Sequence, residues 1–302
     1  MKLKTSLLGG FGKILIIVMA FQAATFTPPG PKNVSASIAP ELPRTYVDTS
    51  FPAQSSSRRI ISVASSCAGR SNCYTALQAA IDAANLGDEV VVDAGMRIMG
   101  PITLREKTSG SGWIVIRTSN LAGIPQPGTR VTPAHAQAMP KIIAPGSNQS
   151  ALVTADRAHN YRLIGIELTE TANDDSNVIV HLGISRSLCA TSAEPYKICT
   201  DQSLLNHYPY NLVLDRVYVH GLPTHNVKRG VELNSKAAAV IDSYISDIHV
   251  VGQDSQAIGG FNGPGPYKIV NNYLEASTEN IIFGGSDPRI QGLIPADIEI
   301  RK

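Results

Sequence analysis

The sequence predicts an all-β solenoid of the parallel β-helix type. Two series of short apolar segments alternate along the second half of the chain and recur about every 30 residues, a period typical of solenoids. The first series is residues 214–218, 241–245 and 270–274. The second series is residues 230–233, 257–260 and 281–284. Each repeat therefore has at least two short strands, which bury their apolar faces only by stacking on neighbouring copies.

Stacked repeats place equivalent residues of successive coils above one another. Tyr244 and Tyr273 are expected to form one such ladder, in the core or along a face. Asp215, Asp242 and Asn271 are expected to form a second ladder, where short amide and carboxylate side chains bond turn backbone. Packing alone explains both ladders, so neither predicts a function.

Composition and charge agree with a folded, β-rich chain. The 302 residues are 43% hydrophobic and 17% charged, with 25 Gly and 19 Pro, which is enough for one domain with a sizeable core. The formal net charge is +2 and no run of Lys and Arg occurs. The sequence therefore lacks the electrostatic pattern of a nucleic-acid partner, and its slightly basic balance is compatible with an acidic polysaccharide.

The N-terminal residues predict export. Residues 1–26 read as a signal peptide, with Lys2 and Lys4 before the apolar run 14–21. An uncleaved anchor is the alternative, although the run is shorter than the ~20 residues needed to span a bilayer. Residues 27–59 are rich in Pro and Ser and predict a linker. We expect a monomer that is secreted, periplasmic or on the cell surface and that meets the membrane only through the signal segment.

Four cysteines fit an oxidising compartment. Their spacing suggests two local disulfides, Cys67–Cys73 before the first coil and Cys189–Cys199 within a long insertion between coils. Other pairings, and four free thiols, remain compatible with the sequence.

A short amphipathic helix is expected before the first coil. Thr75 is a candidate N-cap for this helix. The apolar residues that follow it share one helical face, and these are Leu77, Ala80, Ile81 and Ala84. A Gly87-Asp88 turn ends this segment, and residues 89–95 and 100–104 follow as first-coil strands. Because the open end of a solenoid exposes apolar core and unpaired backbone, such a helix would serve as a cap.

Segment 77–84, the Gly87-Asp88 turn and the Val-rich strand resemble the N-terminal cap and first coil of the right-handed parallel β-helix superfamily. That superfamily includes pectate and pectin lyases, polygalacturonases, chondroitinase B-like lyases and alginate lyases. The similarity continues through residues 161–168 and covers roughly 60–302, and segment 252–274 is also similar to exported bacterial repeat proteins of this class. The resemblance implies one β-helix domain over 60–302. Because Lys302 follows a strand start directly, we expect further coils beyond it.

One candidate site would serve β-elimination on a uronate polymer. That reaction needs a base for the proton beside the carboxylate, and a cation or Ca²⁺ for the developing negative charge. Lys228, Arg229 and Glu232 lie close along one coil. The alternative is that Lys228, Arg229 and Lys236 form a solvated face of the strand that contains Val231 and Leu233. Calcium is the one cofactor considered, with Asp174-Asp175 either a ligand pair or a polar turn.

A second candidate site would serve glycoside hydrolysis, which needs two carboxylates about 5–9.5 Å apart. Coils stack at ~4.8 Å, so carboxylates on neighbouring coils can meet that distance. If Val231, Ile258 and Ile282 share a register, Glu279 aligns with Ser255 and lies one position from Asp254 on the neighbouring coil. Gln253-Asp254 is similar to the double-Asp motif of polygalacturonases, with Gln253 replacing an acid.

Candidate substrate contacts flank these strands. Phe261 and Tyr267 border a Gly/Pro loop and would stack on a sugar or cover the coil edge. His249, like His220 and His225, lies in a turn, where an imidazole acts near neutral pH or serves structure. No nucleotide-binding or zinc-protease motif occurs. The sequence thus favours an exported polysaccharide lyase or glycoside hydrolase, with a non-catalytic glycan-binding or adhesion module as the alternative.

Overall fold

The computed structural model describes residues 41–51, 58–146, 148–172, 175–183 and 203–302. The chain divides into two compact units, Met1–Glu41 and Leu42–Lys302, and every strand and helix named below lies in the second unit. The expected signal peptide and the Cys189–Cys199 pair lie outside the described residues. Within the described ranges, no helix is long and apolar enough to cross a membrane.

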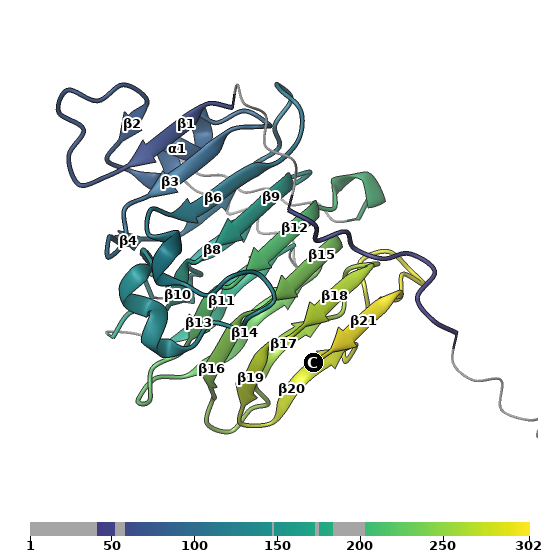
Figure 1. The fold of residues 1–302 in the computed structure, drawn as a ribbon. Coiled ribbons are helices and arrows are strands. Elements are labelled where there is room, and N and C mark those ends of the chain that lie inside the picture. Colours follow the sequence, from purple (N-terminus) through teal and green to yellow (C-terminus); the bar gives the residue numbers. More distant parts are fainter. Residues whose placement is uncertain (1–40, 52–57, 147, 173–174, 184–202) are drawn as a thin grey trace, which may run out of the picture. The chain divides into compact units, whose positions relative to one another are not determined.

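The second unit is a right-handed parallel β-helix, as predicted, built from three parallel sheets (Figure 1). The long sheet contains, in spatial order, β2 (Cys73–Tyr74), β1 (Ile60–Val63), β3 (Glu89–Val92), β6 (Ile114–Thr118), β9 (His159–Ile164), β12 (Tyr210–Asp215), β15 (Lys236–Ile241), β18 (Tyr267–Val270) and β21 (Ile298–Arg301). The β13 sheet contains β4 (Arg97–Met99), β7 (Lys141–Ile143), β10 (Glu167–Thr169), β13 (Tyr218–His220), β16 (Tyr244–Ile248) and β19 (Tyr273–Ala276). The β14 sheet contains β5 (Ile102–Leu104), β8 (Leu152–Thr154), β11 (Ser176–Leu182), β14 (Val227–Leu233), β17 (Gln256–Gly260) and β20 (Glu279–Phe283).

Each coil contributes one strand to each sheet, so β12, β13 and β14 make one coil and β15, β16 and β17 the next. Aliphatic side chains of all three sheets point inward and form one continuous core, in which Leu214, Val219 and Val231 come from a single coil. Because burial contributes ~25 cal/mol of favourable free energy per Å² of apolar surface, this shared core stabilises strands too short to be stable alone.

The turn from the long sheet to the β13 sheet needs a left-handed backbone in each coil. Arg216, Asp242 and Asn271 supply it, with φ of 50°, 53° and 55°. The predicted ladder is correct for Asp242 and Asn271, since Asn271 Nδ2 donates to Asp242 Oδ1 at 2.7 Å. It is wrong for Asp215, which lies opposite Ile241, because its coil carries one more residue between the Asp and the following Tyr.

The tyrosine ladder is confirmed and extends by one coil. Tyr218, Tyr244 and Tyr273 are register partners on the β13 sheet. The rings of Tyr244 and Tyr273 stack with centroids 4.2 Å apart. These rings lie on the outer face of the sheet, since Tyr273 is 37% exposed, and not in the core.

The N-terminal cap is present as α1 (Leu77–Ala83), which lies beside β1 and β3 (Figure 1). Its buried residues are Leu77, Ala80 and Ile81. Its N-cap is Ala76, not the predicted Thr75, and makes no side-chain hydrogen bond. The predicted disulfide Cys67–Cys73 is confirmed.

Two segments cover the outer face of the long sheet. One is residues 42–51, within the range predicted as a linker, whose Val47 packs on Val213, Ala239 and Ile241. The other is the connection after β6, which contains two 3₁₀ helices, η1 (Leu121–Gly123) and η2 (Pro133–Ala138). A third 3₁₀ helix, η3 (Leu205–His207), precedes β12. The outward apolar side chains of the sheet explain this covering, since exposure to water would be unfavourable.

Candidate functional site

The outer face of the β14 sheet carries most of the predicted catalytic residues. Lys228, Arg229 and Glu232 lie on β14, Glu279 begins β20, and Asp254 lies exposed in the loop before β17. Arg229, Gln256 and Glu279 are register partners on three successive coils. The predicted alignment of Glu279 with Ser255 is wrong by one residue, because Ile258 pairs with Ile281 and not with Ile282.

A continuous chain of polar contacts runs across four strands of this face. His181 Nδ1 lies 2.7 Å from Glu232 Oε2, and Arg229 Nη1 donates to Glu232 Oε1 at 3.0 Å. Arg229 Nε donates to Gln256 Oε1 at 3.0 Å, and Gln256 Nε2 donates to Glu279 Oε2 at 2.9 Å. We call these five residues, His181, Arg229, Glu232, Gln256 and Glu279, the β14 network.

Glu232 is the buried centre of the network, with 1% of its side chain exposed. Burial raises the pKa of Glu232, but the hydrogen bond and charge of His181 and the charge of Arg229 outweigh it and hold this pKa below its usual value. The hydrogen bond from Gln256, and then that from Thr278, lowers the pKa of Glu279 in the same way. Both carboxyls are therefore ionised at neutral pH.

His181 was not predicted, and it is the one imidazole of the network. It lies opposite Glu232 on the neighbouring strand β11, with 17% of its side chain exposed. Nδ1 lies within ion-pair distance of the carboxylate, although the contact is outside hydrogen-bond geometry. This negative charge favours a proton on Nδ1 and the lone pair on Nε2 in the neutral ring. An ionised carboxylate that orients a partly exposed imidazole is the arrangement of a general base.

Asp254 and Glu279, predicted as a hydrolytic pair, are offset by two register positions and not by the predicted one, and their role stays a prediction. Asp254 precedes Gln256, the register partner of Glu279, by two positions, and a two-residue step along a strand covers about 6.6 Å. Glu279 already accepts hydrogen bonds from Gln256 and Thr278. Lys228 Nζ donates to Gln253 Oε1 at 3.3 Å, which places this cation near the Asp254 loop.

Of the three predicted substrate contacts, one is buried and two are partly exposed. Tyr267 was predicted wrongly, because it is 1% exposed and its hydroxyl donates to Leu233 O and Ser235 O inside the coil. Phe261 is partly exposed beside the turn after β17, and its backbone N–H donates to Asn234 Oδ1. His249 is partly exposed and its carbonyl accepts from Val227 N–H. The roles of Phe261 and His249 stay predictions.

Among the described residues, no three His, Cys, Asp or Glu side chains converge on a point where a metal ion would be held. Asp174 lies outside the described residues. The carboxylate of Asp175 accepts hydrogen bonds from the backbone and side chain of Asn226, as expected for the polar-turn alternative.

A second ionisable cluster lies on the β13 sheet. Glu167 Oε1 contacts Lys141 Nζ at 2.6 Å and His220 Nε2 at 2.9 Å, and the other nitrogen of His220 lies 2.7 Å from Gly221 O. Burial raises the pKa of Glu167, but the hydrogen bonds and charge interactions with His220 and Lys141 outweigh burial and lower this pKa overall. Both nitrogens of His220 face acceptors, so this imidazole serves structure, in contrast to His181.

No protein-family model and no curated protein matches the sequence. A comparison with solved structures finds similarity to an alginate lyase from Paenibacillus sp. str. FPU-7, at 14% identity and a TM-score of 0.43. The match covers 80% of this chain and 71% of that one.

Proposed function

We propose that this protein is an exported polysaccharide lyase that acts on a uronate-containing polymer at the β14 network. One observation carries the proposal, namely that the ionised, buried carboxylate of Glu232 orients His181 on the outer face of the β14 sheet. The Cys67–Cys73 disulfide supports the exported location, since such bonds persist in oxidising compartments.

The chemistry is β-elimination. Nε2 of His181 removes the proton from the carbon next to the uronate carboxylate, whose charge Lys228 and Arg229 offset. The released electron pair forms a carbon–carbon double bond as the bond to the glycosidic oxygen breaks. The proton then passes from the imidazolium to that oxygen, so the step consumes no water and leaves one unsaturated and one reducing end.

Hydrolysis is the less favoured reaction for this site. It needs two carboxylates facing one bond. Glu232 is instead enclosed by His181 and Arg229. Glu279 already accepts hydrogen bonds from Gln256 and Thr278. The network therefore offers one base and adjacent cations instead of an acid and a nucleophile.

The test is a screen of the full chain on pectin, alginate, chondroitin and neutral glucans, with and without Ca²⁺. Two signals are read together, the ultraviolet absorbance of unsaturated ends and the amount of new reducing ends. The proposal expects both signals on at least one uronate polymer. Reducing ends without absorbance would assign hydrolysis instead.

A non-catalytic glycan-binding module is the second candidate, and the tyrosine ladder favours it. Tyr244 and Tyr273 present stacked rings on the outer face of the β13 sheet, and exposed aromatic rings are suited to contact with sugars. Retained glycan binding without turnover on every polymer would select this function, and Tyr273→Ala would then weaken the binding.

A further inference from the structure

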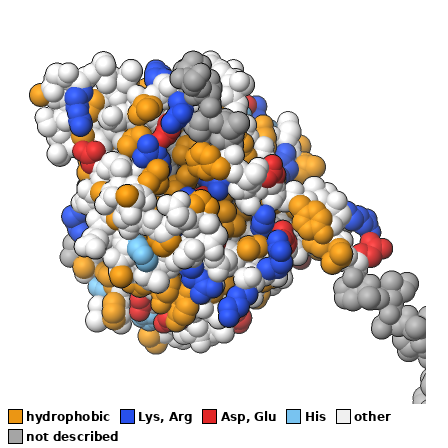
Figure 2. Space-filling model, viewed as in Figure 1, with side chains coloured by type: hydrophobic (Ala, Val, Ile, Leu, Met, Phe, Trp, Pro, Cys, Tyr) orange, Lys and Arg blue, Asp and Glu red, His pale blue; other side chains and the backbone are white. Residues whose placement is uncertain are grey.

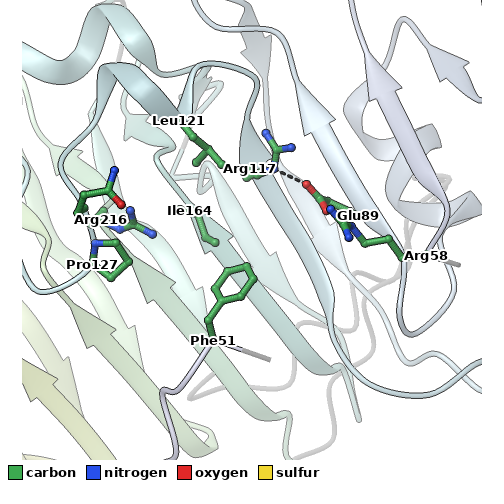
Figure 3. Close-up of a pocket in the computed structure, with 9 residues that line it drawn as sticks. Phe51, Arg58, Glu89, Arg117, Leu121, Pro127, Ile164 and Arg216 are labelled. Carbon is green, nitrogen blue, oxygen red and sulfur yellow. Dashed lines mark hydrogen bonds and ion pairs between the residues drawn. The ribbon is translucent and has the colours of Figure 1, made fainter. Parts of the chain in front are cut away.

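A cavity of about 300 Å³ lies on the outer face of the long sheet (Figure 3), and none of the described residues that line it belongs to the β14 network. It lies between β3, β6 and β9 on one side and the connection after η1 on the other. The described residues that line it are Phe51, Arg58, Glu89, Arg117, Leu121, Gln126, Pro127, Ile164 and Arg216. Figure 2 shows hydrophobic side chains among Lys and Arg on this face. Neither the sequence motifs nor the proposed reaction uses this cavity.

The charged side chains that line the cavity carry more positive than negative charge. Arg58 and Arg117 donate to opposite oxygens of one carboxylate, that of Glu89 (Figure 3). Arg216 and the adjacent Arg162 likewise share a single carboxylate, Asp215, with Arg162 Nη2 2.7 Å and Arg216 Nε 2.7 Å from its oxygens. Among the described residues that line the cavity, three guanidiniums, those of Arg58, Arg117 and Arg216, therefore face one carboxylate, that of Glu89.

The nearby carboxylate of Asp48 does not remove this imbalance, since it interacts with Arg162 and Lys268, neither of which lines the cavity. Residues 52–57, which connect Phe51 to Arg58, are Pro, Ala, Gln and three Ser. Asp215 is completely buried beneath Arg162 and Arg216, so it holds these cations in place without facing the cavity opening. The cavity thus keeps an excess of positive charge held in fixed positions.

Apart from Gln126, the rest of the described wall is apolar. Leu121, Pro127 and Ile164 line the cavity, and the ring of Phe51 lies 5.2 Å from the guanidinium carbon of Arg162. Guanidiniums pair with carboxylates in a fork, and apolar and aromatic side chains contact the faces of a ring. A bound group would therefore combine an anion with a small ring.

We propose that this cavity binds a sugar ring that carries a carboxylate and is a second glycan site, separate from the β14 network. The carboxylate would accept hydrogen bonds from Arg58 and Arg117, and the ring would lie against Phe51 and Ile164. This inference goes beyond the proposed function, because binding is measured without turnover.

The test is calorimetric titration of the full chain with D-glucuronate, D-glucose and inorganic sulfate. We expect D-glucuronate to bind, D-glucose not to bind, and added salt to weaken the binding, since exposed charges are screened. Binding of sulfate at least as tight as that of D-glucuronate would show that the cavity takes a bare anion and would overturn the role of the ring.

Arg58→Gln is the deciding variant, because Glu89 keeps Arg117 as its partner and the fold is least disturbed. A lost charged hydrogen bond should weaken D-glucuronate binding about tenfold or more. Arg97→Gln is the matched control, since it removes the same charge from an exposed position on β4. Equal weakening by both variants, or none by Arg58→Gln, would overturn the proposal. Loss of binding in His181→Ala would place the sugar at the β14 network instead.

Discussion

Glu170 is a buried carboxyl whose environment disfavours its charge. It is 2% exposed, and one oxygen accepts from Leu222 N–H at 2.8 Å. Burial raises its pKa to about 7, against the opposing hydrogen bonds of Leu222 and Ser176. The folded chain therefore holds a proton that the unfolded chain releases near pH 4.5, and stability falls as pH rises between these values.

Glu170→Gln should remove this pH dependence. The amide oxygen still accepts from Leu222 and does not ionise, so above pH 7 the variant should be more stable than the parent, by about 3 kcal/mol at most. Well below pH 4.5 the two proteins should be equally stable. Urea unfolding at both pH values measures the difference, and a difference that does not change with pH would contradict the assignment.

In the proposed reaction, Glu232 sets the tautomer of His181. Glu232→Gln keeps an oxygen for Arg229 but turns its amide toward Nδ1, which moves the ring proton to Nε2 and removes the base. We expect kcat to fall about a hundredfold or more with little change in KM. Steady-state kinetics measure this. Glu106→Gln, which removes an exposed carboxylate paired with Arg157, is the control and should leave kcat unchanged.

At the scale of elements, side chains in the turns tie each coil to the next. Asn234 follows β14, and its Oδ1 accepts the backbone N–H groups of Phe261 and Asn262, each at 2.9 Å. Asn262 repeats the contact one coil further on, where its Oδ1 accepts from Arg289 N–H at 2.7 Å. These bonds satisfy buried backbone donors where the strand ladders end.

Asn234→Ala should be strongly destabilising. It leaves the backbone N–H groups of Phe261 and Asn262 without this acceptor in a turn where Asn234 and Asn262 are fully buried, and each unpaired buried group costs about 1–3 kcal/mol. Urea unfolding should show a loss of about 2–4 kcal/mol. Asn177→Ala, at an exposed position on β11, is the control. A loss no larger than that of the control would mean that the turn finds other partners.

The cap and the strands of the later coils were predictable from the sequence, because the coils from β12 onward repeat their apolar segments about every 30 residues and register follows that spacing. The two register errors, at Asp215 and at Glu279, fall where a coil has one residue more or fewer than the predicted repeat. His181 was missed for a related reason. Its strand, β11, is separated from the next coil by a long insertion, so the roughly 30-residue period does not align His181 with Glu232.

At the scale of the whole β-helix unit, the three sheets present three different outer faces. The β14 sheet carries an oriented imidazole, the β13 sheet carries stacked tyrosines, and the long sheet carries arginines with apolar cover. The packing of residues 42–51 on the long sheet was not predictable, since a Pro- and Ser-rich segment shows no periodicity and its contacts lie far away in sequence. For the same reason the arginine cavity could not be predicted, because Phe51 and Arg216 meet only in the folded chain.

The central claim is that His181 is the base of an eliminating enzyme. The most direct test is the yield of unsaturated ends from the preferred uronate polymer, measured for the parent, His181→Ala and His225→Ala. His225 is the control, since it also pairs with a carboxylate, Asp175, but lies outside the β14 network. The account predicts that unsaturated ends disappear in His181→Ala and persist in His225→Ala. Unsaturated ends formed by His181→Ala at the rate of the parent would contradict it.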